Sequence, residues 1–263
     1  MINDSLKLEI EVEVMKKYNF IPELIWTKLD KGFTNTKYLI STKSQKPLAV
    51  CKVYSDDDII PPALRFEREK HALEIFGGDV APEIIWSSKA NILVYEYIQG
   101  TEFHKTEIDQ DKKELIEKTM IHIHDKARSS GYPLKEDVMT FYQRLVEEYE
   151  NSPKNYPQSL VDDLKKIIKK HGKVLDSNED DLTYIHGDLV PPNLLFQEDK
   201  LMLVDWEYFR PELPCFDSNY LNYYAKAHKI ALEMDVERER KEQYLHLIDI
   251  LEKLWYHGYE NKK

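Results

Sequence analysis

Residues 184–196 read YIHGDLVPPNLLF, and residues 201–208 read LMLVDWEY. Two short apolar runs therefore flank a polar loop that carries Asp188 and Asn193, and the second run ends at Asp205. Phosphoryl transfer needs few groups, but it needs a carboxylate at the attacking hydroxyl and oxygen ligands for a magnesium ion. The spacing predicts Asp188 as the catalytic base, with Asn193 and Asp205 as metal ligands. The alternative is a polar hairpin whose Asp and Asn cap turns, which would make the match in spacing a coincidence.

The hydrophobic period changes from about two in the N-terminal third to about 3.6 in the remainder, as strands give way to helices. Strand-like runs occupy residues 24–29, 37–42, 48–54 and 91–98. Helix-like runs occupy residues 61–76, 111–128, 138–149, 160–170 and 237–256. Residues 9–14 alternate as a strand would but run into a helix-like segment, so both assignments stay open. We expect an α+β fold of two lobes, with an antiparallel-sheet lobe over residues 1–98 and a mainly helical lobe over residues 99–263.

The composition is that of a folded globular protein, with 42% hydrophobic and 32% charged residues among 263. The formal net charge of −11 argues against a nucleic-acid partner, which would need a basic face. No apolar run approaches the roughly 20 residues that span a bilayer, and the first residues lack a signal-peptide pattern. We therefore expect a cytoplasmic protein without a membrane partner, in which Cys51 and Cys215 are free thiols. The oligomeric state stays open.

The run HGDLVPPN at residues 186–193, the run VDWEY at residues 204–208 and the pair Phe216-Asp217 carry a family resemblance. They resemble the aminoglycoside phosphotransferase and choline kinase superfamily, whose fold is protein-kinase-like. Gly187 stands where protein kinases have Arg, which favours a small-molecule substrate. The resemblance implies a small-molecule kinase, a phosphotransferase with an alcohol group as acceptor, that uses ATP and Mg²⁺. It also implies that Asp217 lies on a helix and hydrogen-bonds the catalytic loop, although a helix N-cap would read the same.

Within the superfamily, VDWEY resembles the signature of bacterial choline/ethanolamine kinases, with Glu212 where that signature has Asn. Bacterial thiamine kinases show a similar run, so thiamine kinase and aminoglycoside phosphotransferase stay open, as does a non-catalytic kinase-like binding module. Glu207 carries a carboxylate, and Trp206 and Tyr208 add aromatic faces of the kind that attract a quaternary ammonium. We expect these three residues to meet a small cationic alcohol, choline or ethanolamine preferred. Whether Glu207 contacts the metal or the substrate stays open.

Residues 31–36 read KGFTNT and lie between two expected strands, where backbone N–H groups and small hydroxyl side chains can cover phosphates. A plain hairpin would look the same. The run resembles the Gly-x-Thr-Asn loop of choline kinases. By that resemblance we expect Gly32, Thr34 and Asn35 to contact ATP, while a choice between ATP and GTP stays open.

Lys52 is a charge in the middle of the apolar run 48–54 and needs an anionic partner, a part that nucleotide phosphates can fill. The fold that the chain resembles pairs this Lys with a Glu on the following helix. Glu69 is the candidate, with Glu67 and Glu74 as alternatives nearby. By the same resemblance, residues 95–98, with Glu96 and Ile98, form the linker whose backbone groups would bind adenine.

Overall fold

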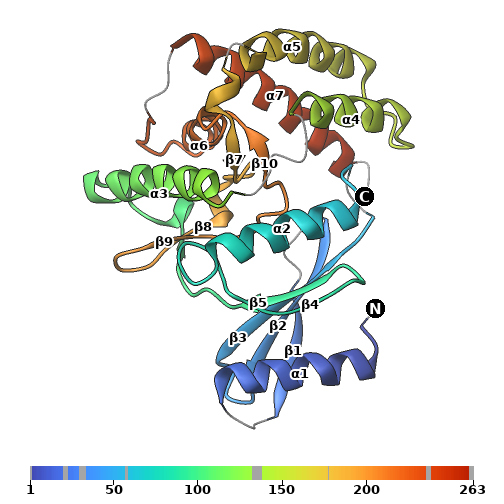
Figure 1. Ribbon diagram of the computed structural model, residues 1–263, viewed down its shortest axis with the longest axis vertical. Coiled ribbons are helices and arrows are strands. Elements are labelled where there is room, and N and C mark those ends of the chain that lie inside the picture. The colour runs from blue at the N-terminus through green and yellow to red at the C-terminus, as the bar shows by residue number, and fades with distance from the viewer. Residues whose placement is uncertain are drawn as a thin grey trace. The chain divides into compact units, whose positions relative to one another are not determined.

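The structure is a computed structural model that describes residues 2–19, 23–29, 34–56, 59–131, 138–176, 178–234 and 238–260. The chain divides into two compact units, Met1–Gly100 and Thr101–Lys263, called unit 1 and unit 2 below. Figure 1 shows the elements of each unit. Unit 1 is built on an antiparallel sheet and unit 2 is mainly helical, so the expected α+β fold class is confirmed.

Unit 1 contains a five-stranded antiparallel sheet in the order β1-β2-β3-β5-β4. Its strands are β1 (Leu24–Leu29), β2 (Asn35–Thr42), β3 (Pro47–Tyr54), β4 (Ile84–Ser88) and β5 (Ile92–Glu96). Helices α1 (Asp4–Tyr18) and α2 (Pro62–Phe76) cover opposite faces of this sheet (Figure 1). Since successive side chains of a strand point to opposite faces, β3 presents Ala49 and Cys51 to a core on one side and Lys52 and Tyr54 to the other.

Residues 9–14, for which the sequence allowed either a strand or a helix, belong to helix α1. Ile10 and Val14, four residues apart, are fully buried against the sheet, which is the helical spacing and not the strand spacing. Asn3 caps the helix by accepting a hydrogen bond from the Leu6 N–H at 2.9 Å. Helix α2 begins after Pro61, where a proline is compatible with the first turn, and ends before Gly77.

Unit 2 contains the helices α3 (Gln110–Ser129), α4 (Val138–Asn151), α5 (Gln158–Asp176), α6 (Cys215–Ala227) and α7 (Arg238–Glu260). Two small sheets accompany them. Strand β7 (Thr183–Ile185) pairs with β10 (Arg210–Glu212), and β8 (Leu194–Phe196) lies between β6 (Thr101–Glu102) and β9 (Leu201–Leu203). The two apolar runs of the decisive sequence are thus β7 and the β8–β9 hairpin, and the loop between β7 and β8 carries the expected catalytic residues.

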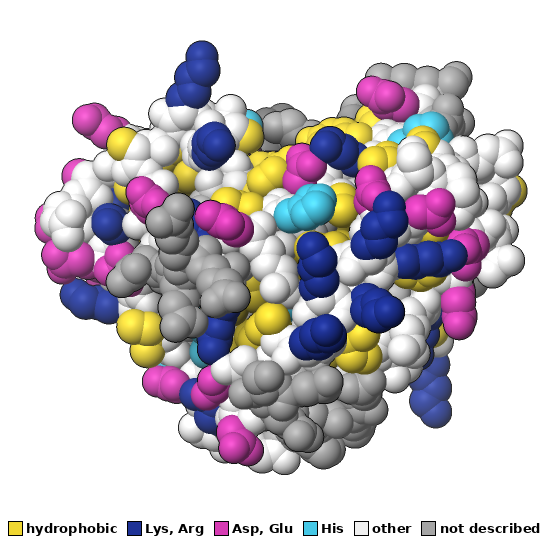
Figure 2. Space-filling model, turned by 90° about the horizontal axis from the view of Figure 1, so that it is seen from above, with side chains coloured by type: hydrophobic (Ala, Val, Ile, Leu, Met, Phe, Trp, Pro, Cys, Tyr) yellow, Lys and Arg dark blue, Asp and Glu magenta, His cyan; other side chains and the backbone are white. Residues whose placement is uncertain are grey.

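Charged side chains of both signs are interspersed with hydrophobic ones over the face shown in Figure 2. The net charge of −11 therefore forms no single acidic field on that face. Among the described residues, no helix combines the length and the apolar character that a bilayer crossing requires.

Candidate active site

The loop between β7 and β8, called the catalytic loop below, is anchored by Asp217, on the first turn of α6. Its carboxylate accepts hydrogen bonds from the backbone N–H groups of His186 and Gly187, both at 2.9 Å. His124 of α3 lies 3.2 Å from the same carboxylate. Burial opposes the ionised form of Asp217, but the hydrogen bonds from His124 and from the Gly187 N–H hold its pKa below the usual value. The implied role of Asp217 as a loop anchor is confirmed, and the N-cap alternative is wrong, because Pro214 is the N-cap of α6.

His186 fixes the loop through its ring nitrogens. Nδ1 accepts from the backbone N–H of Asp188 at 3.2 Å, so Nε2 carries the proton and donates to the Val204 carbonyl at 3.2 Å. This imidazole therefore ties the start of the loop to the end of the β8–β9 hairpin, next to Asp205. Trp206 packs on the ring with a centroid separation of 4.4 Å.

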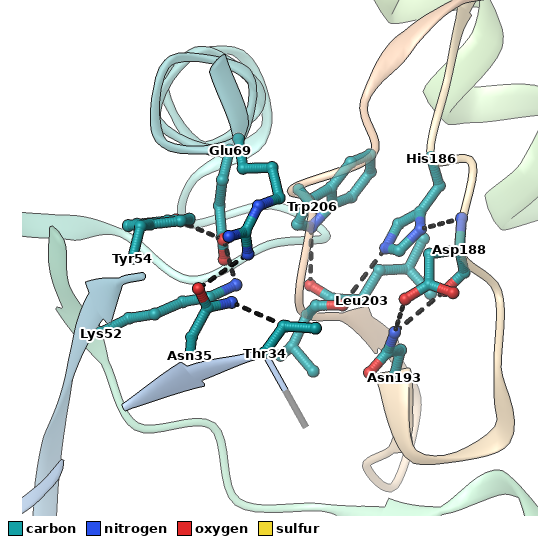
Figure 3. Close-up of polar contacts among 12 residues, drawn as sticks. Thr34, Asn35, Lys52, Tyr54, Glu69, His186, Asp188, Asn193, Leu203 and Trp206 are labelled. Atoms are coloured by element: carbon teal, nitrogen blue, oxygen red, sulfur yellow. Dashed lines mark hydrogen bonds and ion pairs between the residues drawn. The ribbon is translucent and has the colours of Figure 1, made fainter. Parts of the chain in front are cut away.

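Asp188 and Asn193 contact each other directly (Figure 3). The Asn193 amide nitrogen donates to the backbone carbonyl and to Oδ2 of Asp188, both at 2.9 Å. The backbone carbonyl of Asn193 accepts from the Val204 N–H at 3.0 Å, which places Asn193 beside the strand end that carries Asp205. The side-chain amide nitrogen of Asn193 makes both contacts to Asp188. The side-chain amide oxygen, the atom that magnesium would prefer as a ligand, takes part in neither contact.

Two residues of this region have backbones in the left-handed region, with φ of 78° at Gly187 and 67° at Asp205. A Cβ at Gly187 would lie 2.6 Å from the Tyr208 carbonyl and would collide with the guanidinium of Arg210, so only glycine fits. At Asp205 a non-glycine residue accepts this conformation, which costs about 1 kcal/mol or more and is typical of functional sites.

Carboxylates gather around Asp188. Burial raises its pKa well above the usual value, and the negative charges of Asp205, Glu252 and Glu207 raise it further. The donor set of Asp205 and Asn193 offers one carboxylate and one amide oxygen, the hard ligands that magnesium takes. A divalent cation here would relieve the mutual repulsion of these carboxylates, so the residues fit the metal.

The three residues expected to meet the substrate lie in different surroundings. Trp206 is 0% exposed, and its Nε1 donates to the Leu203 carbonyl at 2.9 Å, so it belongs to the packing beneath the loop. Its ring presents no exposed surface in this structure, and contact between Trp206 and a substrate stays a prediction. Glu207 is buried, and Tyr208 is half-buried and accepts from Arg210 through its carbonyl.

Sequence reasoning missed a carboxylate on α7. Glu252 is 7% exposed and accepts hydrogen bonds from the hydroxyl groups of Tyr220 and Tyr224 of α6, each at 2.5 Å. Burial raises the pKa of Glu252, while these two donors act against the shift. Helical spacing offered a signal, because Glu252 follows the buried Tyr244 and Ile248 at intervals of four and so interrupts an apolar stripe.

In unit 1, Lys52 and Glu69 form a buried ion pair (Figure 3). Lys52 Nζ lies 2.5 Å from Glu69 Oε2, and the side chains are 0% and 1% exposed. The choice among three glutamates resolves to Glu69, because Glu67 and Glu74 are exposed. Tyr54 was not anticipated: its hydroxyl donates to the same Glu69 oxygen at 2.5 Å, and its ring lies 4.9 Å from Lys52 Nζ.

The other expected nucleotide residues are only partly described. Gly32 lies outside the described residues. Asn35 begins β2, and its amide donates to Thr34 Oγ1 at 3.3 Å. The Glu96 N–H donates to the Glu83 carbonyl at 3.0 Å, and the Glu96 side chain pairs with Lys17. Adenine contact through the backbone of Glu96 and Ile98 stays a prediction.

Known proteins resemble this chain in sequence or in fold. Protein LicA homolog of Mycoplasma capricolum subsp. capricolum is 25% identical over 166 residues, which cover 59% of this chain and 62% of that protein, less than two thirds of its length. The choline kinase of Cryptosporidium parvum Iowa II has a TM-score of 0.61 at 14% identity, covering 95% of this chain and 89% of that one. The GDP and kanamycin complex of APH(2″)-IIIa has a TM-score of 0.59 at 16% identity, covering 97% and 98%. At these identities the two structures share the fold alone.

The family itself is shown by the sequence, which matches the phosphotransferase enzyme family over residues 25–253. This match confirms the expected superfamily at the level of the phosphotransferase enzyme family. The chain belongs to the phosphotransferase enzyme family.

Proposed function

We propose that the protein transfers a phosphoryl group from ATP, in a magnesium-dependent reaction, to the hydroxyl of a small cationic molecule, with choline or ethanolamine preferred. The observation that carries this proposal is the constellation on the catalytic loop, in which Asn193 holds Asp188 at 2.9 Å and Asp205 follows at the end of β9. Unit 1 supports it with the buried Lys52–Glu69 pair, which leaves a lysine positioned for phosphates.

Asp188 would act on the acceptor hydroxyl. Its Oδ2 accepts from Asn193, so Oδ1 is the oxygen that would orient the hydroxyl and take its proton. The hydroxyl oxygen would form a bond to the γ-phosphorus of ATP while the bond from that phosphorus to the oxygen of the β-phosphate breaks and ADP leaves. Asn193 and Asp205 would hold the magnesium ion through their side-chain oxygens. When bound, the ion would neutralise charge on the nucleotide phosphates. Asp217 and His186 keep the loop in place meanwhile, through contacts that need no ligand.

The preference for a cation rests on Glu252 and its two tyrosines. A buried carboxylate is costly without a positive partner, and the charge of Glu252 acts on Asp188, so the two belong to one electrostatic environment. The rings of Tyr220 and Tyr224, with centroids 5.5 Å apart, add faces that attract an ammonium by about 0.5–2 kcal/mol per desolvated contact. We assign the acceptor cation to Glu252, with Glu207 and Tyr208 nearer the loop.

The test compares kcat/KM for choline, ethanolamine, thiamine and kanamycin with that for 3,3-dimethylbutanol, the neutral isostere of choline. We expect choline or ethanolamine to exceed the neutral alcohol by about tenfold or more. Glu252→Gln should shrink that ratio, while Glu242→Gln, an exposed change on the same helix, should not. Equal use of the neutral alcohol, or exclusive use of a sugar, would reject the cation preference. Preference for kanamycin would favour an aminoglycoside phosphotransferase.

A non-catalytic binding module is the competing reading of the same fold. The retention of Asp188, Asn193, Asp205 and Lys52 counts against it, because a module without turnover does not need all four. Magnesium-dependent release of ADP, measured across a library of small alcohols, separates the two. If no alcohol raises the release above the background measured without an acceptor, the binding module is favoured.

A further inference from the structure

Arg65 of α2 makes contacts that neither the catalytic loop nor the Lys52–Glu69 pair requires. Its side chain is 0% exposed, and its guanidinium donates to three segments of unit 1. Nε donates to the Ile60 carbonyl at 2.9 Å, Nη1 to Asn35 Oδ1 at 2.8 Å, and Nη2 to the Ser55 carbonyl at 2.5 Å. Each of the three guanidinium nitrogens of this buried side chain therefore donates a hydrogen bond.

The acceptors converge on the start of β2. Ser55 Oγ donates to the Thr34 carbonyl at 2.5 Å, and the Asn35 amide donates to Thr34 Oγ1 at 3.3 Å. Arg65 thus holds Asn35 directly and holds Thr34 through Ser55. Asn35 Oδ1 accepts from Arg65, which fixes the direction in which the amide N–H groups point.

The chemistry of arginine suits this task better than that of lysine. The planar guanidinium offers donors in a fixed fork, whereas an ammonium on a flexible stem cannot meet three acceptors at these positions. Arg65 also precedes Glu69 by four residues, so both side chains leave the same face of α2. One helix therefore orients Thr34 and Asn35 through Arg65, and Lys52 through Glu69.

We propose that Arg65 is a positioning residue that fixes Thr34 and Asn35 for the phosphates of the nucleotide. This inference rests on the proposed function, because it assumes that these two residues meet ATP. Arg65 itself contacts the protein and acts through Asn35 and Ser55.

Arg65→Lys is the first test, with Arg128→Lys on the exposed part of α3 as the matched control. Without nucleotide, hydrogen exchange should speed up at residues 34–36 in Arg65→Lys and stay unchanged in the control. The dissociation constant for the magnesium complex of AMP-PNP should rise about tenfold, as expected when a buried charged hydrogen bond is lost. KM for the acceptor and kcat at saturating ATP should stay as in wild type.

A second variant, Asn35→Ala, distinguishes a folding defect in Arg65→Lys from the loss of positioning, because it keeps Arg65 and its two carbonyl acceptors. Asn35→Ala should weaken AMP-PNP binding to a similar degree, and the double variant should be no weaker than the worse single one. If wild type binds no AMP-PNP, the proposed function fails. If wild type binds and Arg65→Lys matches it in affinity and exchange, or if the two losses add, the role of Arg65 fails.

Discussion

Unit 1 and unit 2 bury charges of opposite sign. Among the described residues of unit 1, the buried charged side chains are three cations and one carboxylate, Lys52, Arg65, Arg68 and Glu69. In unit 2 they are four carboxylates and one arginine, Glu207, Glu212, Asp217, Glu252 and Arg210, joined by three histidines. Burying an excess of one sign is unfavourable unless a partner of the other sign compensates it. This difference supports the proposal that unit 1 binds nucleotide phosphates and that unit 2 binds a metal ion and an ammonium group.

The largest expected effect separates chemistry in unit 2 from nucleotide binding in unit 1. Asp188→Asn should lower kcat by about 10²- to 10⁴-fold, because general-base assistance is lost, while nucleotide affinity stays nearly intact. Steady-state kinetics and AMP-PNP titration measure the two quantities. Asp199→Asn, in the exposed turn of the β8–β9 hairpin, is the control. Wild-type turnover in Asp188→Asn, with chemistry rate-limiting, would remove Asp188 from its proposed role.

The next effect concerns the cation that the carboxylates of unit 2 would attract. Asn193→Ala and Asp205→Ala should each require about tenfold or more magnesium for half-maximal activity, the size of effect seen for groups that support a metal. Because both residues would hold the same ion, the rise in magnesium requirement of the double variant should be smaller than the two single effects combined. Magnesium titrations of the three variants test this. Fully additive losses would indicate two independent roles.

The proposed catalytic residues could be picked out from the sequence because they lie close together in it. Asp188, Asn193 and Asp205 lie on one loop and the following hairpin, so their spacing alone constrains their geometry. Trp206 shows the limit of that reasoning: it lies between Asp205 and Glu207 in the sequence, yet its burial is a tertiary property that the motif does not encode. Glu252 needed the packing of α6 on α7, about thirty residues apart, to meet its tyrosines.

The hydrophobic period was enough to predict the fold class, but it did not predict helices α1 and α6. Residues 9–14 fit both periods over a short window, and only burial of Ile10 and Val14 decides for α1. Helix α6 reads CFDSNYLNYYAKA, whose Asn, Asp and Tyr residues have weak helix propensity. It forms because Asp217 and the buried face with Phe216 and Leu221 are held by tertiary contacts.

A smaller effect should appear in the acid stability of unit 2. The folded-state pKa of Asp217 is lowered, so its ionised form stabilises the fold above the unfolded value of about 4, and this stability is lost as pH falls through the lowered pKa. The free energy of unfolding should therefore differ most between wild type and Asp217→Asn near neutral pH, and the difference should narrow below about pH 4. Urea unfolding across this range measures it. A difference that does not change with pH would show that the charge of Asp217 is unimportant.

The smallest expected effect lies in unit 1, at Tyr54. Its hydroxyl shares Glu69 Oε2 with Lys52, so it orients the carboxylate that in turn orients the lysine. Tyr54→Phe keeps the ring and removes one hydrogen bond, worth about 1 kcal/mol, which corresponds to about a fivefold rise in the dissociation constant for AMP-PNP. Since Lys52 still compensates the buried Glu69, the protein should fold, and the acceptor KM should not change. Tyr38→Phe on the neighbouring strand β2 is the control. Loss of acceptor binding in Tyr54→Phe would contradict the proposal that unit 1 binds the nucleotide and unit 2 the acceptor. Unchanged AMP-PNP affinity would show that Lys52 and Glu69 hold their geometry without Tyr54.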